Sequence, residues 1–135
     1  MGEAEFARLT LAELRQRYGE STPRRQFLLR RLQTVTRLLS ETGSLRHLYL
    51  FGSFTTAKPN PGDLDCLAVM AAGFTTVNLP AHLLDVFQHD LCRLYYHADM
   101  FWVTKVLRRG HIEAMLAVFS HDRHGTLQPI VEVTV

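Results

Sequence analysis

Cysteine and tryptophan are scarce in this sequence, with two cysteines and one tryptophan among 135 residues. Cys66 and Cys92 both stand among apolar residues, which favours buried thiols in a reducing compartment over a disulfide framework. The longest apolar run, residues 66–74, is far shorter than the roughly 20 residues of a membrane-spanning helix. The first residues carry acids where a signal peptide would be basic. We therefore expect a cytoplasmic protein that does not contact a membrane.

Net charge is also small, at +2, but it is unevenly distributed. Residues 1–50 carry nine arginines and five acids, whereas residues 51–135 carry six basic and eight acidic residues. This balance does not by itself indicate nucleic-acid binding. The length and the 47% of hydrophobic residues fit one domain with one core over residues 1–135. We divide it into three segments: N-terminal helices (1–43), a motif-bearing core (44–104), and a C-terminal helix and strand (105–135).

Two helices are expected in the N-terminal segment. Thr10 can cap a short helix that Gly19 ends, and Ser21 or Thr22 can cap a longer one that begins at Pro23. The apolar residues of the longer helix recur at helical spacing and predict its buried face: Leu28, Leu32, Val35 and Leu39. We interpret the arginines around that face mainly as solvated surface, with nucleic-acid contact as the alternative: Arg24, Arg25, Arg30, Arg31 and Arg37.

After Ser44 the pattern changes to short apolar strands separated by turns and helices. We predict strands at residues 47–51, 63–70, 96–103 and 129–135, with Pro129 marking the last as an edge strand. Further helices are predicted at 80–91 and 110–119, an irregular loop at 54–62 and a turn at 122–125. The expected fold is α/β (α+β), with a mixed β-sheet and helices packed mainly on one face.

Acidic residues interrupt two of these apolar strands. Asp63 and Asp65 alternate along one strand, so we expect their carboxylates on the same face. Asp99 is likewise an acidic residue within another predicted apolar strand. Such carboxylates repel one another in apolar surroundings, and their oxygens suit Mg²⁺ or Mn²⁺. Three carboxylates could hold two such ions. The alternative is structural, with Asp63 capping the loop and Asp99 paired with an arginine.

Gly52-Ser53 directly follows the first predicted core strand. A glycine lets the backbone approach a phosphate closely, and Ser53 can donate its amide and hydroxyl to phosphate oxygens. The order is more informative than the pair alone: an apolar strand, Gly-Ser, nine residues, Asp-x-Asp on a second apolar strand, then a third carboxylate.

This order resembles the nucleotidyltransferase superfamily of DNA polymerase β, whose signature is hydrophobic-Gly-Ser, a short spacer and Asp-hydrophobic-Asp-hydrophobic. Residues 50–53 and 63–66 match that signature position by position, and the matching core covers roughly residues 44–104. The resemblance implies the nucleotidyltransferase-type sheet and the transfer of a nucleoside monophosphate from an NTP to an acceptor hydroxyl, with pyrophosphate leaving.

The resemblance also implies roles for individual residues. Asp63 and Asp65 would hold the metals that bind the triphosphate, and Asp99 would help hold the catalytic metal and aid deprotonation of the acceptor. Gly52 and Ser53 would bind the β- and γ-phosphates. Lys58 either reaches the triphosphate or stays solvated, and Lys105, Arg108, Arg109 and Arg123 either neutralise pyrophosphate or are surface charges.

The chain is too short for the second, helical domain by which larger relatives contact the base and the acceptor. A second protomer, a helical partner protein or a macromolecular acceptor such as RNA would then complete the site. One alternative is a non-catalytic or antitoxin-type module of a toxin–antitoxin pair that retains the fold. Another is a modifier of small molecules, such as an aminoglycoside nucleotidyltransferase. Residues 54–58 depart from the cluster of small or basic residues that usually follows Gly-Ser in the minimal antitoxin nucleotidyltransferases, and Gly62 stands where those proteins have a serine before the first Asp.

Other reactive residues are assigned simpler roles. His97 is predicted on the strand face of Asp99, as a hydrogen-bonded neighbour or as a group that orients the acceptor. His121 and His124 lack the spacing of a zinc site. Cys66 is predicted to point away from the carboxylates and not to act as a nucleophile.

Overall fold

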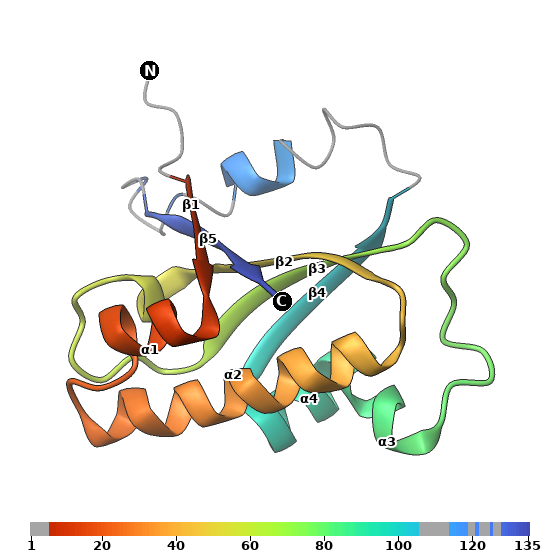
Figure 1. The fold of residues 1–135 in the computed structure, drawn as a ribbon, viewed down its shortest axis with the longest axis horizontal. Coiled ribbons are helices and arrows are strands. Elements are labelled where there is room, and N and C mark those ends of the chain that lie inside the picture. The colour runs from red at the N-terminus through yellow and green to blue at the C-terminus, as the bar shows by residue number, and fades with distance from the viewer. Residues whose placement is uncertain (1–5, 106–113, 119–120, 122–124, 126–127) are drawn as a thin grey trace.

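The computed structural model describes residues 6–105, 114–118, 121, 125 and 128–135, in which five strands form one mixed sheet (Figure 1). The strands lie in the order β1-β5-β2-β3-β4. Strand β3 is antiparallel to β2 and parallel to β4, while β5 is antiparallel to β2 and parallel to β1. Their bounds are β1 (Phe6–Thr10), β2 (Leu45–Phe51), β3 (Leu64–Met70), β4 (Ala98–Thr104) and β5 (Ile130–Thr134).

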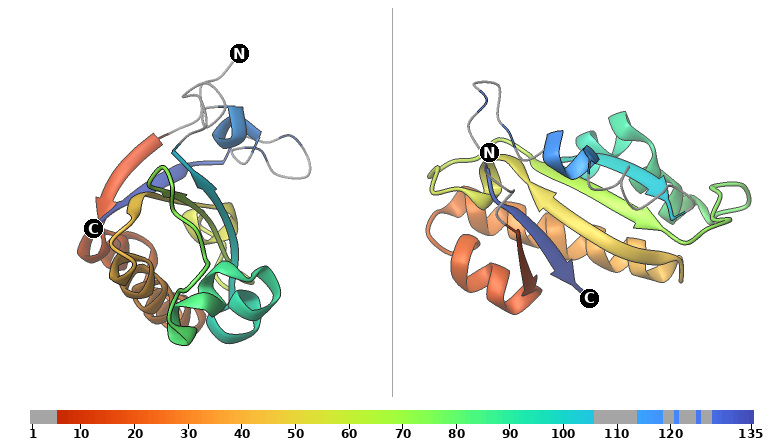
Figure 2. Two further views of the ribbon diagram at one scale, coloured as in Figure 1. Left: turned by 90° about the vertical axis from the view of Figure 1, so that its right-hand side faces the viewer. Right: turned by 90° about the horizontal axis from the view of Figure 1, so that it is seen from above.

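Four labelled helices cover one face of this sheet, and the helical residues 114–118 lie over the other (Figures 1 and 2). This arrangement confirms the expected α+β class and the placement of helices mainly on one face. None of the described helices is both long enough and apolar enough to cross a membrane. The elements are α1 (Leu11–Tyr18), α2 (Pro23–Glu41), α3 (Ala81–Leu84), α4 (His89–Tyr96) and the 3₁₀ turns Gly52–Thr55 and Asp85–Phe87.

The starts of α1 and α2 agree with the prediction. The Thr10 hydroxyl accepts a hydrogen bond from the Glu13 amide at 3.1 Å, and the Glu13 carboxylate accepts one from the Thr10 amide at 3.2 Å. This capping box and the Thr22 cap of α2 satisfy amides that lack partners within the helix. Residues 6–10 were included among the N-terminal helices, but they form β1, because their backbone pairs with β5 over its full length.

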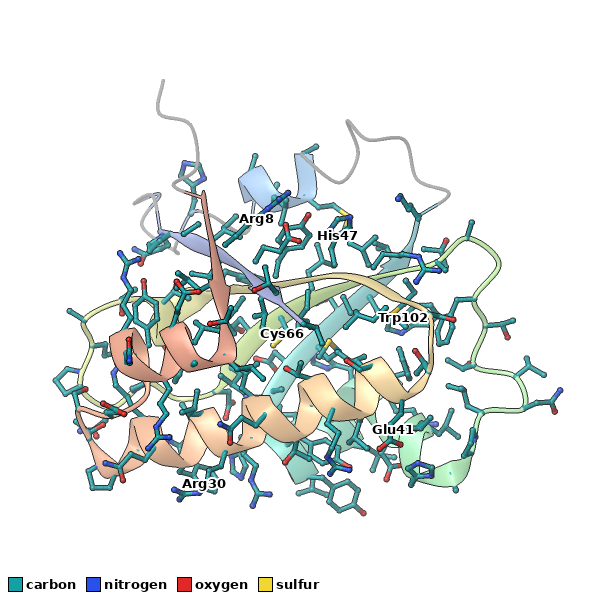
Figure 3. All side chains as sticks on the ribbon, viewed as in Figure 1. Arg8, Arg30, Glu41, His47, Cys66 and Trp102 are labelled. Atoms are coloured by element: carbon teal, nitrogen blue, oxygen red, sulfur yellow. The ribbon has the colours of Figure 1, made fainter. Side chains whose placement is uncertain are left out.

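The two faces of the sheet follow the alternation of the strands. Leu48, Leu50 and Cys66 face the helices and pack with the buried stripe of α2, whereas Tyr49 and Leu67 face the opposite side and pack near Leu116. Cys66 lies between the sheet and α2 (Figure 3), and both cysteines are free and buried. The prediction of buried thiols is therefore confirmed.

Strand β5 is not an edge strand, contrary to the prediction from Pro129. It lies between β1 and β2, and Pro129 immediately precedes it, so the missing N–H removes no bond within the strand. The Pro129 carbonyl instead accepts a hydrogen bond from the Thr55 hydroxyl at 3.0 Å.

The helix predicted at 80–91 is broken in the structure. Gln88 has an extended backbone, with φ −104° and ψ 112°, and separates the 3₁₀ turn Asp85–Phe87 from α4. Phe87 packs against Phe74 and Trp102, with ring centroids 5.1 and 5.5 Å apart, so tertiary packing overrides the helical pattern. Of the C-terminal predictions, residues 114–118 are helical as expected; residues 106–113, 119–120, 122–124 and 126–127 lie outside the described part of the chain.

Candidate active site

Three strand ends meet at the candidate active site. Because β3 is parallel to β4 and antiparallel to β2, the starts of β3 and β4 lie beside the end of β2. Asp65 is in register with Phe51 on one side and with Asp99 on the other. Asp63 immediately precedes β3, so it is part of the loop end and not of the strand predicted to carry it.

The carboxylates of Asp65 and Asp99 lie on the face of the sheet that the four labelled helices leave open. Their strand neighbours Leu64 and Ala98 belong to the core beneath the helices, and successive side chains alternate between faces. Asp63 lies beside them, because Arg93 Nε is within 3.6 Å of both Asp63 and Asp99, so the predicted set Asp63, Asp65 and Asp99 is brought together at one corner of the sheet.

Gly52 lies directly against one of these carboxylates. Its φ of +76° favours glycine, and a Cβ atom at this position would overlap with Asp65 Oδ2. The 3₁₀ turn that begins here is held by the Thr55 hydroxyl, which donates to Gly52 O at 3.0 Å, and by the Thr56 hydroxyl, which donates to Ser53 O at 2.7 Å. The structure thus places the Gly-Ser turn beside the acidic pair.

The carboxylates at this corner lie close enough to act on one another electrostatically. Burial, the charges of Asp99 and Asp63, and a side-chain interaction with Asp99 that favours the protonated form raise the pKa of Asp65 to about 6. Asp99 Oδ1 is buried and has no hydrogen-bond partner within the described structure. A raised carboxyl pKa beside a buried, unpaired carboxylate oxygen is typical of groups that bind a ligand or transfer a proton.

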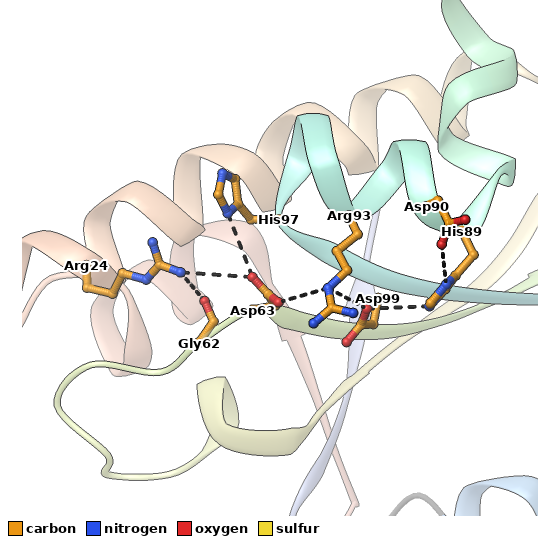
Figure 4. Close-up of polar contacts among 8 residues, drawn as sticks. All are labelled: Arg24, Gly62, Asp63, His89, Asp90, Arg93, His97 and Asp99. Atoms are coloured by element: carbon orange, nitrogen blue, oxygen red, sulfur yellow. Dashed lines mark hydrogen bonds and ion pairs between the residues drawn. The ribbon is translucent and has the colours of Figure 1, made fainter.

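Four basic side chains lie around Asp63 and Asp99 (Figure 4). The Arg93 Nε atom lies 3.5 Å from Asp63 Oδ2 and 3.6 Å from Asp99 Oδ1. Nearby, His89 Nε2 lies 3.4 Å from Asp99 Oδ1, while Arg24 and His97 approach Asp63 Oδ1 at 3.9 and 3.7 Å. All of these separations exceed the usual N–H···O hydrogen-bond length.

The donor set fits a divalent metal in its chemistry. Carboxylate oxygens are preferred by Mg²⁺ and Mn²⁺, and Asp99 Oδ1, which accepts no hydrogen bond in the described structure and lies 3.4–3.6 Å from His89 and Arg93, is a candidate ligand. No group of three or more His, Cys, Asp or Glu side chains in the described residues has the arrangement of a ready-made metal site. Asp63, Asp65 and Asp99 would therefore have to adjust around an ion, and Arg93 would have to move from between them.

The loop between Gly52-Ser53 and Asp63 is fastened to the start of α2. Arg25 is only 2% exposed, and its guanidinium makes five hydrogen bonds of 2.5–3.1 Å to four backbone carbonyls. The acceptors are Tyr18, Phe54, Thr56 and Lys58. Arg24 likewise donates to the carbonyls of Pro61 and Gly62. The prediction that these two arginines form a solvated face is wrong, because the helix wheel cannot show a loop folding back over them.

The structure assigns different surroundings to the remaining predicted residues. The Lys58 side chain is exposed, and no ion pair links it to the three carboxylates. Lys105 lies beyond the far end of β4, about 20 Å from Asp99 at 3.3 Å per residue, so it is not at this corner. Arg108, Arg109, Arg123 and His124 lie outside the described residues.

The sequence predicts His97 on the same strand as Asp99, but in the structure it does not lie on β4. It ends α4 in the left-handed conformation, with φ 53°, and its Nδ1 approaches Asp63 instead of Asp99. Its ring packs edge-on against Phe27 at 4.9 Å.

The cysteines behave as expected, because burial raises the pKa of Cys92 to about 12 and that of Cys66 well above its usual value.

Sequence reasoning missed the basic side chains of α4. His89 and Arg93 are four residues apart on α4, so they share one face of that helix and both reach Asp99. That spacing was the only local signal available. The pairing with Asp99 depends on α4 leading directly into β4. The sequence predicted one helix over residues 80–91 and a strand from residue 96, which hid this connection.

Comparisons with known proteins identify a family but no activity. Searches of curated proteins and of solved structures found no match. Residues 3–134 match the profile of a family described as "Family of unknown function (DUF6932)". Since the match spans nearly all of the sequence, the chain belongs to the DUF6932 family.

Proposed function

We propose that this protein is a metal-dependent nucleotidyltransferase that transfers a nucleoside monophosphate from an NTP to a hydroxyl group of an acceptor. The observation that carries the proposal is the gathering of Asp63, Asp65 and Asp99 at one corner of the sheet, directly beside the Gly52-Ser53 turn. Phosphoryl-type transfer depends mainly on positioning and charge neutralisation, which is what such a corner can supply.

Each residue of the corner has a proposed task. Asp63, Asp65 and Asp99 would hold Mg²⁺ or Mn²⁺, which supplies charge neutralisation for the triphosphate when bound. Asp99, with its buried Oδ1 lacking a hydrogen-bond partner, would also accept the proton of the acceptor hydroxyl. Gly52 and Ser53 would bind the β- and γ-phosphates through backbone and hydroxyl donors.

The acceptor site is proposed to be completed by another molecule. Exposed apolar side chains lie on the two elements that flank Asp99. Leu94 (67% exposed) and Tyr95 (50%) are on α4, and Phe101 (41%) is on β4, two residues beyond Asp99. These side chains support a second protomer or a helical partner protein, with an RNA, protein or small-molecule acceptor. The two free thiols support a reducing compartment such as the cytoplasm.

The direct test is label transfer. The purified protein is incubated with a lysate, Mg²⁺ and each of the four NTPs labelled at the α-phosphate, because that phosphate is transferred. We expect incorporation by the unaltered protein and none by the Asp63→Ala/Asp65→Ala variant. Asp90→Ala is a matched control, since Asp90 is a fully exposed acid on α4 whose side chain lies 3.7 Å from His89 Nδ1. Incorporation that survives the double substitution would refute the assignment of these carboxylates.

A second candidate is a non-catalytic or antitoxin-type binding module that retains the same fold. The observation that favours it is the position of Arg93, which places a positive charge between Asp63 and Asp99. Calorimetry separates the two candidates, because a module that binds only a partner protein has no Mg²⁺-dependent affinity for an NTP.

A further inference from the structure

Arg93 lies where the proposed metal site is most negative. Its Nε atom is nearly equidistant from Asp63 Oδ2 and Asp99 Oδ1, at 3.5 and 3.6 Å (Figure 4). Its positive charge also acts on Asp65, where it opposes the rise in pKa caused by burial and by the other two carboxylates. One guanidinium therefore partly neutralises all three acidic groups.

The contacts of Arg93 are loose in comparison with those of another arginine of this chain. Arg25 is buried and makes hydrogen bonds as short as 2.5 Å, whereas the Arg93 side chain is 60% exposed and its two ion pairs are longer than hydrogen bonds. The guanidinium is thus held loosely and in contact with water, whereas the carboxylates it pairs with are only 24–26% exposed. Arg93 can therefore leave the carboxylates when another cation takes its place, which Arg25 cannot do with its carbonyls.

We propose that Arg93 is an exchangeable counterion, which neutralises the carboxylates in the metal-free protein, yields its place to the divalent cation, and then binds phosphate oxygens of the incoming triphosphate. This inference rests on the proposed function and adds a phosphate-binding residue to it. The guanidinium and a metal ion cannot both lie between Asp63 and Asp99, since they would repel each other.

The displaced guanidinium remains close to the site. Arg93 belongs to α4, the helix that leads directly into β4, so its backbone stays next to the start of that strand. Guanidinium groups bind phosphate oxygens through two parallel hydrogen bonds, which a triphosphate beside the carboxylates would satisfy. Arg93 would then contribute to substrate binding from the side opposite to the Gly52-Ser53 turn.

A purely structural ion pair makes a different prediction. If Arg93 only stabilised the fold of this corner, its removal would weaken the binding of metal and of phosphate together. If Arg93 competes with the metal and binds phosphate, its removal strengthens the binding of the metal and weakens the binding of phosphate. The opposite signs of the two changes are therefore the diagnostic result.

The test measures two affinities without measuring catalysis. Mn²⁺ alone is titrated against the protein by electron paramagnetic resonance, and inorganic tripolyphosphate with saturating Mg²⁺ is titrated by calorimetry. The variants are Arg93→Gln and, as a matched control, Arg15→Gln, because Arg15 is an exposed arginine that pairs with Glu20. Asp63→Ala/Asp65→Ala reports whether Mn²⁺ binds at this corner, and circular dichroism verifies that each variant is folded.

For Arg93→Gln we expect the Kd for Mn²⁺ to fall about fivefold, the equivalent of one exposed ion pair. We expect the Kd for tripolyphosphate to rise about tenfold, the loss of one charge-assisted contact. Arg15→Gln should change neither value. An unchanged or weaker Mn²⁺ affinity in Arg93→Gln, with Mn²⁺ binding still dependent on Asp63 and Asp65, overturns this inference alone.

The remaining outcomes are equally decisive. Unchanged tripolyphosphate affinity in Arg93→Gln overturns the role of Arg93 in binding phosphate. If neither the unaltered protein nor Arg93→Gln binds Mn²⁺, or if the binding survives the loss of Asp63 and Asp65, both this inference and the proposed metal site are refuted.

Discussion

Replacement of Asp65 by asparagine should stabilise the metal-free protein at neutral pH. The folded protein raises the pKa of Asp65 from its ordinary value of 3.8 to about 6, so the ionised form is disfavoured by the fold. A shift of two units corresponds to about 3 kcal/mol, which the partial exposure of the side chain reduces to about 1–2 kcal/mol. Asparagine keeps the shape of the side chain beside Gly52 and removes the charge.

The sign of the pH dependence follows from proton linkage. Between pH 3.8 and about 6 the folded protein holds a proton on Asp65 more often than the unfolded chain does. The destabilisation caused by ionised Asp65 is therefore complete above pH 6 and disappears as the pH falls towards 4. Asp65→Asn should exceed the unaltered protein in free energy of unfolding at pH 7.5, and the difference should vanish near pH 4.

Urea unfolding in EDTA, followed by the fluorescence of the single tryptophan, Trp102, measures this difference at both pH values. Asp90→Asn is the control, because its fully exposed carboxylate should have no comparable effect. Added Mn²⁺ should stabilise the unaltered protein more than Asp65→Asn, since ligand binding to the folded state adds to its stability. A lower stability of Asp65→Asn at pH 7.5, or a difference that does not depend on pH, would refute the electrostatic account of this corner.

Three further substitutions test the scaffold of the site by urea unfolding. Arg25→Met should lower the free energy of unfolding by about 3 kcal/mol, because it leaves four backbone carbonyls, of which that of Phe54 is buried, without their donor; a loss below 1 kcal/mol would contradict the loop-fastening role. Gly52→Ala should cost about 1–3 kcal/mol and weaken Mn²⁺ binding, because φ is positive and the new Cβ overlaps with Asp65; unchanged stability would argue against that contact. Thr10→Ala should cost about 1 kcal/mol through loss of the helix cap without changing Mn²⁺ affinity.

Local signals predicted much of the fold. The caps at Thr10 and Thr22, the buried stripe of α2 and the strands on either side of Gly52-Ser53 each depend on neighbouring residues, and each is present. The paired carboxylates and the third acid could be selected for the same reason, because a charge within an apolar strand is conspicuous in the sequence itself.

Long-range pairing accounts for the errors. Residues 6–10 become a strand only because β5 lies beside them, and Pro129 is compatible with an interior strand because it immediately precedes that strand. Arg25 became a buried residue because the loop to Lys58 folds over it, 33 residues further along the chain. No window of local sequence contains these partners.

The sequence by itself therefore predicted α1 and α2, the strands on either side of Gly52-Ser53 and the acidic residues of the candidate site. Only the tertiary structure decided which basic side chains surround those acids, because Arg24 reaches Asp63 from α2, whereas Arg93 and His97 reach it from α4 and its C-terminal cap. The physical reason is that spacing along a strand or helix is fixed by local backbone geometry, whereas charge neutralisation acts through space between segments that the fold alone brings together.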